Sequence, residues 1–305
     1  MDNNKALQAH LSMFTAEAIW GMMAPVGKQA MLHGIDSLDM VTFRVTGAAI
    51  LFWIFSFFAP KEHVPLRDIL ILALAALFGV TFNQCLFTLG LGITSPINAS
   101  ICTTSMPIFA MIIAFFVIHE PITLKKAGGV ALGCLGAVIL ILTSMRGGNG
   151  KVGNIVGDIM CLCAQLSFAI YLSAFRNVIK RYSVFTLNKW MFVFASLYVW
   201  PFTWHNVCSI PFASLSLATW SETGFVVVFG TFVSYLLMMV GQRVLRPTVD
   251  SVYNYVQPIV SVVVSLLMGV GVFTLWQGLA IILVFSGVWM VTKSKSKRDI
   301  DAQQQ

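Results

Sequence analysis

The sequence predicts an all-α integral membrane protein, with about ten transmembrane helices arranged as two inverted five-helix repeats. Three observations lead to this prediction: an apolar composition, a series of hydrophobic runs of spanning length, and an internal repeat. Of the 305 residues, 58% are hydrophobic and only 10% are charged, whereas soluble domains average about 45–50% apolar and about 25% charged residues. A soluble fold of this length has too little interior to hide so much apolar surface, so the expected solvent is a lipid bilayer.

A helix that spans a bilayer needs about 20 predominantly apolar residues. Runs of roughly that length follow one another, and their short connections leave no room for a soluble domain. The first run has no A-x-A cleavage site and is too long for the apolar region of a signal peptide, so we expect it to be retained as a helix. The predicted spans are 11–31, 38–58, 67–90, 95–118, 123–143, 155–175, 185–204, 221–242, 248–269 and 273–292.

Basic residues set the orientation, because cytoplasmic loops carry an excess of Lys and Arg. With the N-terminus in the cytoplasm, fifteen basic residues fall in cytoplasmic segments, and only Arg146 and Lys151 fall in an external loop. We therefore expect a multi-pass protein of the cell (inner) membrane whose N- and C-termini are both cytoplasmic. The fifteen are Lys5, Lys61, Arg67, Lys125, Lys126, Arg176, Lys180, Arg181, Lys189, Arg243, Arg246, Lys293, Lys295, Lys297 and Arg298.

The two halves of the chain repeat at an offset of 151 residues, without a gap. The matched pairs include Phe78/Phe229, Gly79/Gly230, Gly90/Gly241, Pro96/Pro247, Ser100/Ser251, Pro107/Pro258, Ile108/Ile259, Thr123/Thr274, Leu124/Leu275 and Gly136/Gly287. Because each copy holds an odd number of spans, the second copy must enter the membrane in the opposite direction. We predict a first repeat over residues 1–145 and a second over 146–305. Such inverted repeats are typical of transporters, which hold their substrate near the bilayer midplane between the repeats.

The ninth span carries a row of polar residues. Asp250, Asn254, Gln257, Ser261 and Ser265 follow at steps of four, three, four and four, which places all five on one helical face. Polar groups inside a span are costly and usually face the bundle interior or a water-filled cavity, so Asn254 and Gln257 are candidates for lining a substrate cavity. The alternative is that this face makes helix–helix hydrogen bonds, or, for Asp250, an ion pair with a nearby arginine.

Glu17 lies in the middle of the first span, with Trp20 on nearly the same face. A carboxylate at this depth is a candidate site for a coupling proton, because burial raises its pKa towards neutrality. It could equally contact a cationic part of the substrate or form a structural ion pair with a basic residue such as Arg44. Lys28 is about 16 Å further along an ideal helix, so we expect it to extend to the outer interface rather than to pair with Glu17.

Other polar and aromatic residues within spans complete the predicted site. The equivalent cavity candidates in spans three, four, six and eight are Asn83, Gln84, Asn98, Thr103, Gln165 and Tyr235, and the candidate aromatic walls are Trp20, Phe168 and Tyr253. From these, we predict that the substrate contacts Glu17, Trp20, Asn83, Gln165, Tyr235, Tyr253, Asn254 and Gln257. Three prolines, Pro25, Pro107 and Pro258, are expected to interrupt their helices and to create bends for gating.

Several function classes are disfavoured by what the sequence lacks. All five histidines fall at span edges or in loops, the six cysteines have no paired CxxC spacing, and there is no GxSxG or P-loop motif. We therefore expect no catalytic residue, no metal site and no cofactor. The basic residues form no patch among aromatics, which disfavours nucleic acid as a partner. The expected partners are a small-molecule substrate, the lipid bilayer and a coupling proton, and the alternative function is a non-transporting membrane receptor or scaffold.

A set of short motifs resembles the drug/metabolite transporter superfamily, EamA type. The residues that carry the resemblance are Trp20-Gly21, Pro25, Lys28, Arg44, the run from Gly90-Leu91-Gly92 to Pro107, His119-Glu120-Pro121-Ile122, Asp158 and Pro258. The resemblance covers about residues 11–292. The family usually repeats the acidic residue after the ninth span, where this chain has Val270-Gly271. What the resemblance implies is a secondary carrier, often an exporter of amino acids or other small metabolites, that works by alternating access and needs no cofactor.

Overall fold

In the computed structural model, residues 3–118, 123–147, 152–244, 253–254 and 256–292 are described, and every regular element among them is a helix. The elements are α1 (Asn3–Leu32), α2 (Ser37–Ser56), α3 (Leu66–Ala76), η1 (Leu77–Phe82), α4 (Asn83–Ile93), α5 (Pro96–Thr103), α6 (Met106–Ile118), α7 (Leu124–Gly147), α8 (Ile155–Ala174), α9 (Arg176–Arg181), α10 (Val184–Cys208), η2 (Phe212–Ser214), α11 (Leu217–Val227), η3 (Val228–Val233), α12 (Ser234–Val244), α14 (Val256–Leu267) and α15 (Leu275–Thr292). Each predicted span contains at least one of these helices, so the predicted fold class is confirmed. The division of the repeats at residue 145 stays a prediction.

Length and composition place these helices in a membrane. Among the described residues, five helical segments are long and apolar enough to cross a bilayer, namely Ser37–Ser56, Leu66–Ile93, Pro96–Ile113, Ile155–Ala174 and Leu217–Gly241. Shorter apolar helices lie at Ala127–Leu140, Val256–Leu267 and Leu275–Met290. The 30-residue α1 and the 25-residue α10 are also long enough to span. Large apolar side chains such as Phe202 (83% exposed) and Leu275 (91% exposed) point outwards, as lipid-facing residues do.

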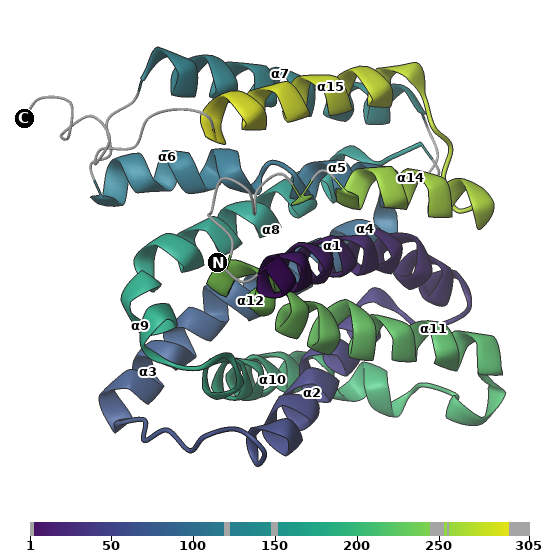
Figure 1. The fold of residues 1–305 in the computed structure, drawn as a ribbon. Helices are drawn as coiled ribbons and strands as arrows, with labels where there is room; N and C mark the ends of the chain where they lie inside the picture. The colour runs from purple at the N-terminus through teal and green to yellow at the C-terminus, as the bar shows by residue number, and fades with distance from the viewer. Residues whose placement is uncertain (1–2, 119–122, 148–151, 245–252, 255, 293–305) are drawn as a thin grey trace, which may run out of the picture.

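The two repeats pack against each other as symmetry mates. Gly90 of α4 meets α8, where a Cβ would lie 2.7 Å from the carbonyl oxygen of Gly157, and its mate Gly241 of α12 meets α1, where a Cβ would collide with Met13. In the same way, Gly136 of α7 and its mate Gly287 of α15 lie against each other's helix. Figure 1 shows α7 and α15 side by side at the top of the view. Small residues let membrane helices approach this closely.

Each repeat also contains a π-helical turn at the same place. The turns are η1 (Leu77–Phe82) and η3 (Val228–Val233), and their first and last residues are each separated by the repeat offset of 151. No feature of the sequence predicted them. π-turns occur mostly as single-turn bulges inside α-helices, frequently at functional sites. Their occurrence in both copies therefore makes these two spans candidates for a functional role.

The prolines behave differently from one another. Pro107 follows a break at residues 104–105 between α5 and α6, as expected, and Pro258 lies in the first turn of α14. Pro25, in contrast, lies inside a continuous α1, so the prediction that it interrupts its helix is wrong. The first span therefore enters the core of the bundle as one long helix.

The two ends of the bundle are made of different segments. The N-terminal end holds the start of α1, the α2–α3 connection, α9 and the start of α10, and lies to the left in Figure 1. The opposite end holds the last turns of α1 and α4 and the starts of α5, α8, α11 and α15. At the N-terminal end, Glu62 accepts hydrogen bonds from Ser183, and at the opposite end His33 lies 3.0 Å from Glu222.

Candidate functional site

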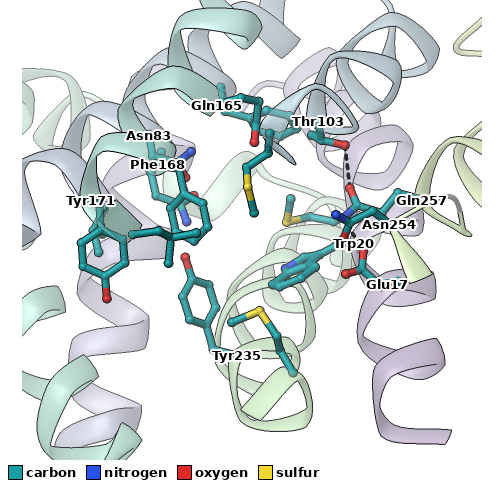
Figure 2. A pocket seen from close by; sticks show the side chains of 18 of the residues that line it. Glu17, Trp20, Asn83, Thr103, Gln165, Phe168, Tyr171, Tyr235, Asn254 and Gln257 are labelled. Atoms are coloured by element: carbon teal, nitrogen blue, oxygen red, sulfur yellow. Dashed lines mark hydrogen bonds between the residues drawn. The ribbon is translucent and has the colours of Figure 1, made fainter. Parts of the chain in front are cut away.

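A central cavity of about 570 Å³ lies between the two repeats. A cavity of this size is within the usual range for small-molecule sites. Residues from both repeats line it, and most of its surface is apolar. The lining includes Met13, Glu17, Trp20, Met23, Arg44, Asn83, Gln84, Phe87, Thr103, Met106, Gln165, Phe168, Tyr171, Asn188, Met191, Tyr235, Met238, Met239, Asn254 and Gln257. Figure 2 shows how the labelled side chains converge on the same space.

One wall of the cavity is a polar corner built around Gln257. Its side-chain nitrogen donates to Glu17 Oε2 at 2.5 Å, and its side-chain oxygen accepts from Thr103 Oγ1 at 2.8 Å. The contact joins α1, α5 and α14, and Figure 2 shows Asn254 beside it. Glu17 is only 2% exposed. A buried carboxylate that faces a cavity can hold a proton or attract a cationic group.

Aromatic side chains extend from Trp20, beside this corner, through Tyr235 to Phe168 and Tyr171 on the far side of the cavity (Figure 2). Trp20 and Tyr235 meet edge to face, with ring centroids 5.9 Å apart, and Phe168 and Tyr171 lie 5.6 Å apart. The Trp20 indole nitrogen donates to the carbonyl oxygen of Gly230 in η3 at 3.0 Å, which fixes the ring. Such rings offer flat apolar area, and their faces attract cations.

Two further polar residues of the lining are held by the protein itself. The side-chain nitrogen of Asn83 donates to the carbonyl oxygen of Ala164 at 2.9 Å. Arg44 is 3% exposed and donates to Thr88 Oγ1 at 3.0 Å and to Thr231 Oγ1 at 3.2 Å. The guanidinium thereby ties α2 to α4 and to η3, which keeps a permanent positive charge in the wall.

The structure brings together seven of the eight predicted contact residues. Tyr253 is the exception: its hydroxyl lies 2.6 Å from His10 Nδ1, and it is absent from the cavity lining. Asp250 lies outside the described residues. Lower in the same helical row, Ser261 donates to the carbonyl oxygen of Pro96 at 3.1 Å and so serves helix packing. The row on span nine is therefore divided between the cavity and the helix contact.

Lys28 also lies elsewhere than expected. It is 8% exposed, and its ammonium group donates to the carbonyl oxygens of Leu91 at 3.0 Å and Gly92 at 2.6 Å. The prediction that it extends to the outer interface is therefore wrong. A lysine that caps the last carbonyls of a helix satisfies acceptors that would otherwise be orphaned in an apolar setting.

Some lining residues were not found from the sequence. Six of them are methionines, namely Met13, Met23, Met106, Met191, Met238 and Met239. In a membrane sequence they merge with the other apolar residues, so no pattern distinguishes them. Methionine is flexible and polarisable, and it suits surfaces that adapt to ligands of different shape. Asn188 and Tyr171, near the start of α10 and the end of α8, are further lining residues that the sequence did not reveal.

The opposite end of the bundle is closed by buried hydrogen bonds around Asp158. Thr94 donates to this carboxylate at 2.5 Å and Asn98 at 3.1 Å, while Gln277 donates to Asn98 Oδ1 at 2.6 Å. All four residues are fully buried. The bonds join α8, the α4–α5 turn and α15. We call Thr94, Asn98, Asp158 and Gln277 the closing cluster.

The cavity reaches the N-terminal end and stops short of the closing cluster. Its lining extends to Ile179 and Val184, on the connection between α9 and α10. Towards the opposite end, it goes no further than residues such as Ala24 and Ser100. Among the described residues, the closing cluster thus separates the central cavity from the opposite end, while the cavity lining continues towards the N-terminal end.

Known proteins share this sequence pattern and fold. The family model described as the EamA-like transporter family matches residues 7–142 and 155–293. The "Uncharacterized transporter YetK" of Bacillus subtilis is 22% identical over 298 residues, which is 97% of this chain and 90% of that protein. The "WAT1-related protein At1g43650" of Arabidopsis thaliana is 23% identical, over 94% of this chain and 92% of that protein.

A solved crystal structure supports the same architecture. It superimposes with a TM-score of 0.63 and 16% identity, over 93% of this chain and 95% of that one. At this identity the likeness speaks for the fold alone. The family match, in contrast, takes in both repeats and most of the chain. The chain belongs to the EamA-like transporter family.

Proposed function

We propose that this membrane transporter is a secondary carrier that moves a small metabolite by alternating access around the central cavity. The observation that carries the proposal is a cavity between inverted repeats that is approached from one end and closed at the other by the closing cluster. In carriers of this type, rocking of one repeat against the other exchanges the open and closed ends around a fixed site. The related proteins named as transporters support the same reading.

The substrate is a small amphipathic compound such as an amino acid or a related metabolite. Glu17 and Gln257 offer acceptors to a donor-bearing or cationic head, and Asn254 adds an amide beside them. Trp20 and the methionines offer apolar contact to the rest of the molecule. Ligand sites commonly combine a mostly apolar lining with a few polar groups that fix orientation.

The proposal includes the direction of transport and its coupling to a proton. The basic residues favour cytoplasmic termini, and the N-terminal end, from which the cavity is approached, would then face the cytoplasm. A carrier resting in this state loads its substrate from inside, which fits an exporter. Glu17 is the candidate carrier of a coupling proton.

A metabolite screen tests the function with the purified full-length protein. A bound ligand raises the melting temperature by mass action, so hits from a library of amino acids, amines and related metabolites identify candidate substrates. Each hit is then tested for counterflow in proteoliposomes. Saturable, hit-specific exchange supports a carrier. Hits that stabilise the protein without crossing the bilayer would favour the alternative, a receptor or scaffold.

The orientation is tested separately with tags at the two termini. Both tags should be inaccessible to a protease added outside intact cells. Cleavage of the C-terminal tag from outside would contradict the proposed orientation, and cleavage of only one tag would contradict an even number of spans.

A further inference from the structure

A second hollow lies at the N-terminal end, between α3, the end of α8 and α9. Its volume is about 300 Å³. We call it the α3–α9 pocket, and it is lined by Arg67, Asp68, Ile71, Ala174, Phe175, Asn177, Val178 and Arg181. It shares no lining residue with the central cavity. Two guanidinium groups and one carboxylate give this small hollow a chemistry of its own.

The carboxylate of this pocket, Asp68, already accepts hydrogen bonds from neighbouring side chains. Asp68 Oδ2 accepts from Arg181 Nη1 at 2.5 Å and from the Tyr182 hydroxyl at 2.5 Å. Asp68 is 4% exposed, whereas the side chain of Arg181 remains 57% exposed. Arginine presents five donors in a planar fork, so this contact leaves further donors of Arg181 free for a second acceptor.

A second carboxylate near the pocket, Glu62, is also hydrogen-bonded within the protein. Glu62 accepts from the backbone nitrogen of Ser183 at 3.0 Å and from its hydroxyl at 2.9 Å. Partial burial acts to raise the pKa of Glu62, but the hydrogen bonds from Thr186 and Ser183 outweigh it, so the pKa lies below its usual value. Glu62 therefore stays ionised and bound to the start of α10, and it does not extend to the pocket.

Three cations on α9 and at the start of α3 have no direct ion-pair partner in the part of the chain that the structure describes. Arg67, Arg176 and Lys180 are exposed, and across the residues that the structure describes none of them forms a hydrogen bond or an ion pair. Two of them belong to the six-residue α9, whose Val178 is buried at 6% exposure. The surface of α9 and the start of α3 therefore carry a net positive charge.

The same pocket adjoins an apolar stripe on α3. Leu66, Leu70 and Leu74 are 72%, 64% and 52% exposed and stand four residues apart, so they share one face of the helix. In a membrane protein, such a face contacts acyl chains. The basic pocket thus lies at the end of a lipid-facing stripe, where the apolar part of the bilayer gives way to head groups.

We propose that the α3–α9 pocket binds the phosphate head group of an anionic phospholipid, whose acyl chain follows the leucine stripe of α3. Arginine forks match phosphate geometry, and basic pockets between helices at the cytoplasmic side suit anionic head groups. The site is independent of what the central cavity carries. It adjoins the cavity entrance, because Ile179 of α9 lines the central cavity and Val178 lines this pocket, so a bound head group would hold one rim of that entrance.

Lipid binding is tested by native mass spectrometry and melting temperature on the purified full-length protein. Phosphatidylglycerol and phosphatidylcholine with identical acyl chains are compared for the natural protein, Arg67→Gln, and Arg67→Gln with Lys180→Gln. Neither side chain forms a hydrogen bond or an ion pair with another described residue, so the variants should fold. We expect preferential binding of phosphatidylglycerol, and a loss of about fivefold in its apparent affinity for each charge removed. Lys125→Gln, an exposed lysine outside the pocket, is the matched control and should bind as the natural protein does.

The same proteins are also tested with two soluble anions, inorganic phosphate and glycerol phosphate. Stabilisation by phosphatidylglycerol that depends on Arg67, with no comparable effect of either soluble anion, supports the proposal. Equal binding of the two lipids, or unchanged phosphatidylglycerol affinity in the double variant, would overturn it. An Arg67-dependent shift produced by millimolar inorganic phosphate alone would overturn the lipid as ligand and identify a soluble phosphate compound instead.

Discussion

Gln257 in the second repeat binds Glu17 in the first, with its side-chain nitrogen 2.5 Å from the carboxylate oxygen Oε2. The same amide accepts from Thr103, the residue that lies at the repeat position of Asn254. In the described part of the lining, the carboxylate of Glu17 is therefore held by a neutral hydrogen-bond donor that comes from the other repeat.

Glu17→Gln should separate coupling from binding. The change keeps the shape and one hydrogen-bonding oxygen while it removes the titratable group, so pH-gradient-driven transport should be lost and counterflow exchange largely kept. Both are measured in proteoliposomes. Glu222→Gln, at the opposite end beside His33, is the control and should retain driven transport. Undiminished gradient-driven transport in Glu17→Gln would remove the proton role.

Asn254→Ala and Gln257→Ala should differ, although both residues line the cavity. Asn254 makes no hydrogen bond within the described part of the chain, so its loss should weaken substrate affinity and leave the melting temperature near that of the natural protein. Gln257→Ala removes the hydrogen bonds that Gln257 donates to Glu17 and accepts from Thr103, and each such bond contributes about 0.5–1.5 kcal/mol. It should therefore lower stability as well as affinity. Normal transport by Asn254→Ala would place the substrate elsewhere.

Opening of the closing cluster should expose Cys102. This thiol is 2% exposed and donates to the carbonyl oxygen of Asp158 at 3.7 Å. Asp158→Ala removes the acceptor that holds Thr94 and Asn98, so the opposite end should open more often. We expect Cys102 to react several-fold faster with a membrane-impermeant maleimide, measured on the side that faces this end.

The labelling experiment needs a background in which Cys102 is the reporter. The exposed cysteines Cys134, Cys163 and Cys208 are first replaced by serine. Cys161 is fully buried beside the same carboxylate and should follow Cys102. Gln277→Ala, which removes a different bond of the cluster, should act in the same direction. If both variants fold and the labelling rate is unchanged, this end is sealed by other contacts.

The fold was largely predictable because it depends on patterns that survive in a single sequence. The length of the hydrophobic runs predicted the spans, and matched residues 151 positions apart predicted the repeat. The failures are local. Pro25 lies inside a continuous helix, which the sequence does not reveal. The π-turns η1 and η3 have no distinctive composition that would predict them.

The candidate site was predictable where polarity is rare. Glu17 and Gln257 stand out in apolar spans, whereas the lining methionines do not. The partner of each polar group could not be predicted, because hydrogen bonds such as those of Lys28 and Asp158 depend on distant segments meeting. Lys28 meets the end of α4, and Asp158 meets the α4–α5 turn. The same reason applies to Tyr253, which was predicted to line the cavity because it is next to Asn254 in the sequence. The sequence did not reveal that its hydroxyl lies beside His10.

The matched π-turns should tolerate an added methyl group unequally. In η1, a Cβ on Gly79 would lie 2.6 Å from the ring of Tyr171, which is buried at 6% exposure. In η3, a Cβ on the repeat mate Gly230 would lie 2.7 Å from Met23 Cγ. A packed ring moves only with its surroundings, whereas methionine has several rotatable bonds. Gly79→Ala should therefore cost about 1–3 kcal/mol from overpacking, and Gly230→Ala should cost less.

Gly224→Ala provides the control for this comparison, because no atom lies within 4 Å of its added Cβ. In α11, that change should be neutral or should stabilise by about 0.4–1 kcal/mol, since alanine loses less backbone entropy than glycine. Melting temperatures of the three variants give the order of stability, and counterflow in proteoliposomes gives the effect on transport. Tyr171 and Met23 both line the central cavity, but the packed ring is displaced less easily, so Gly79→Ala should also reduce transport more than Gly230→Ala. Equal melting temperatures for the two π-turn variants would show that η1 can shift away from Tyr171 as readily as Met23 bends.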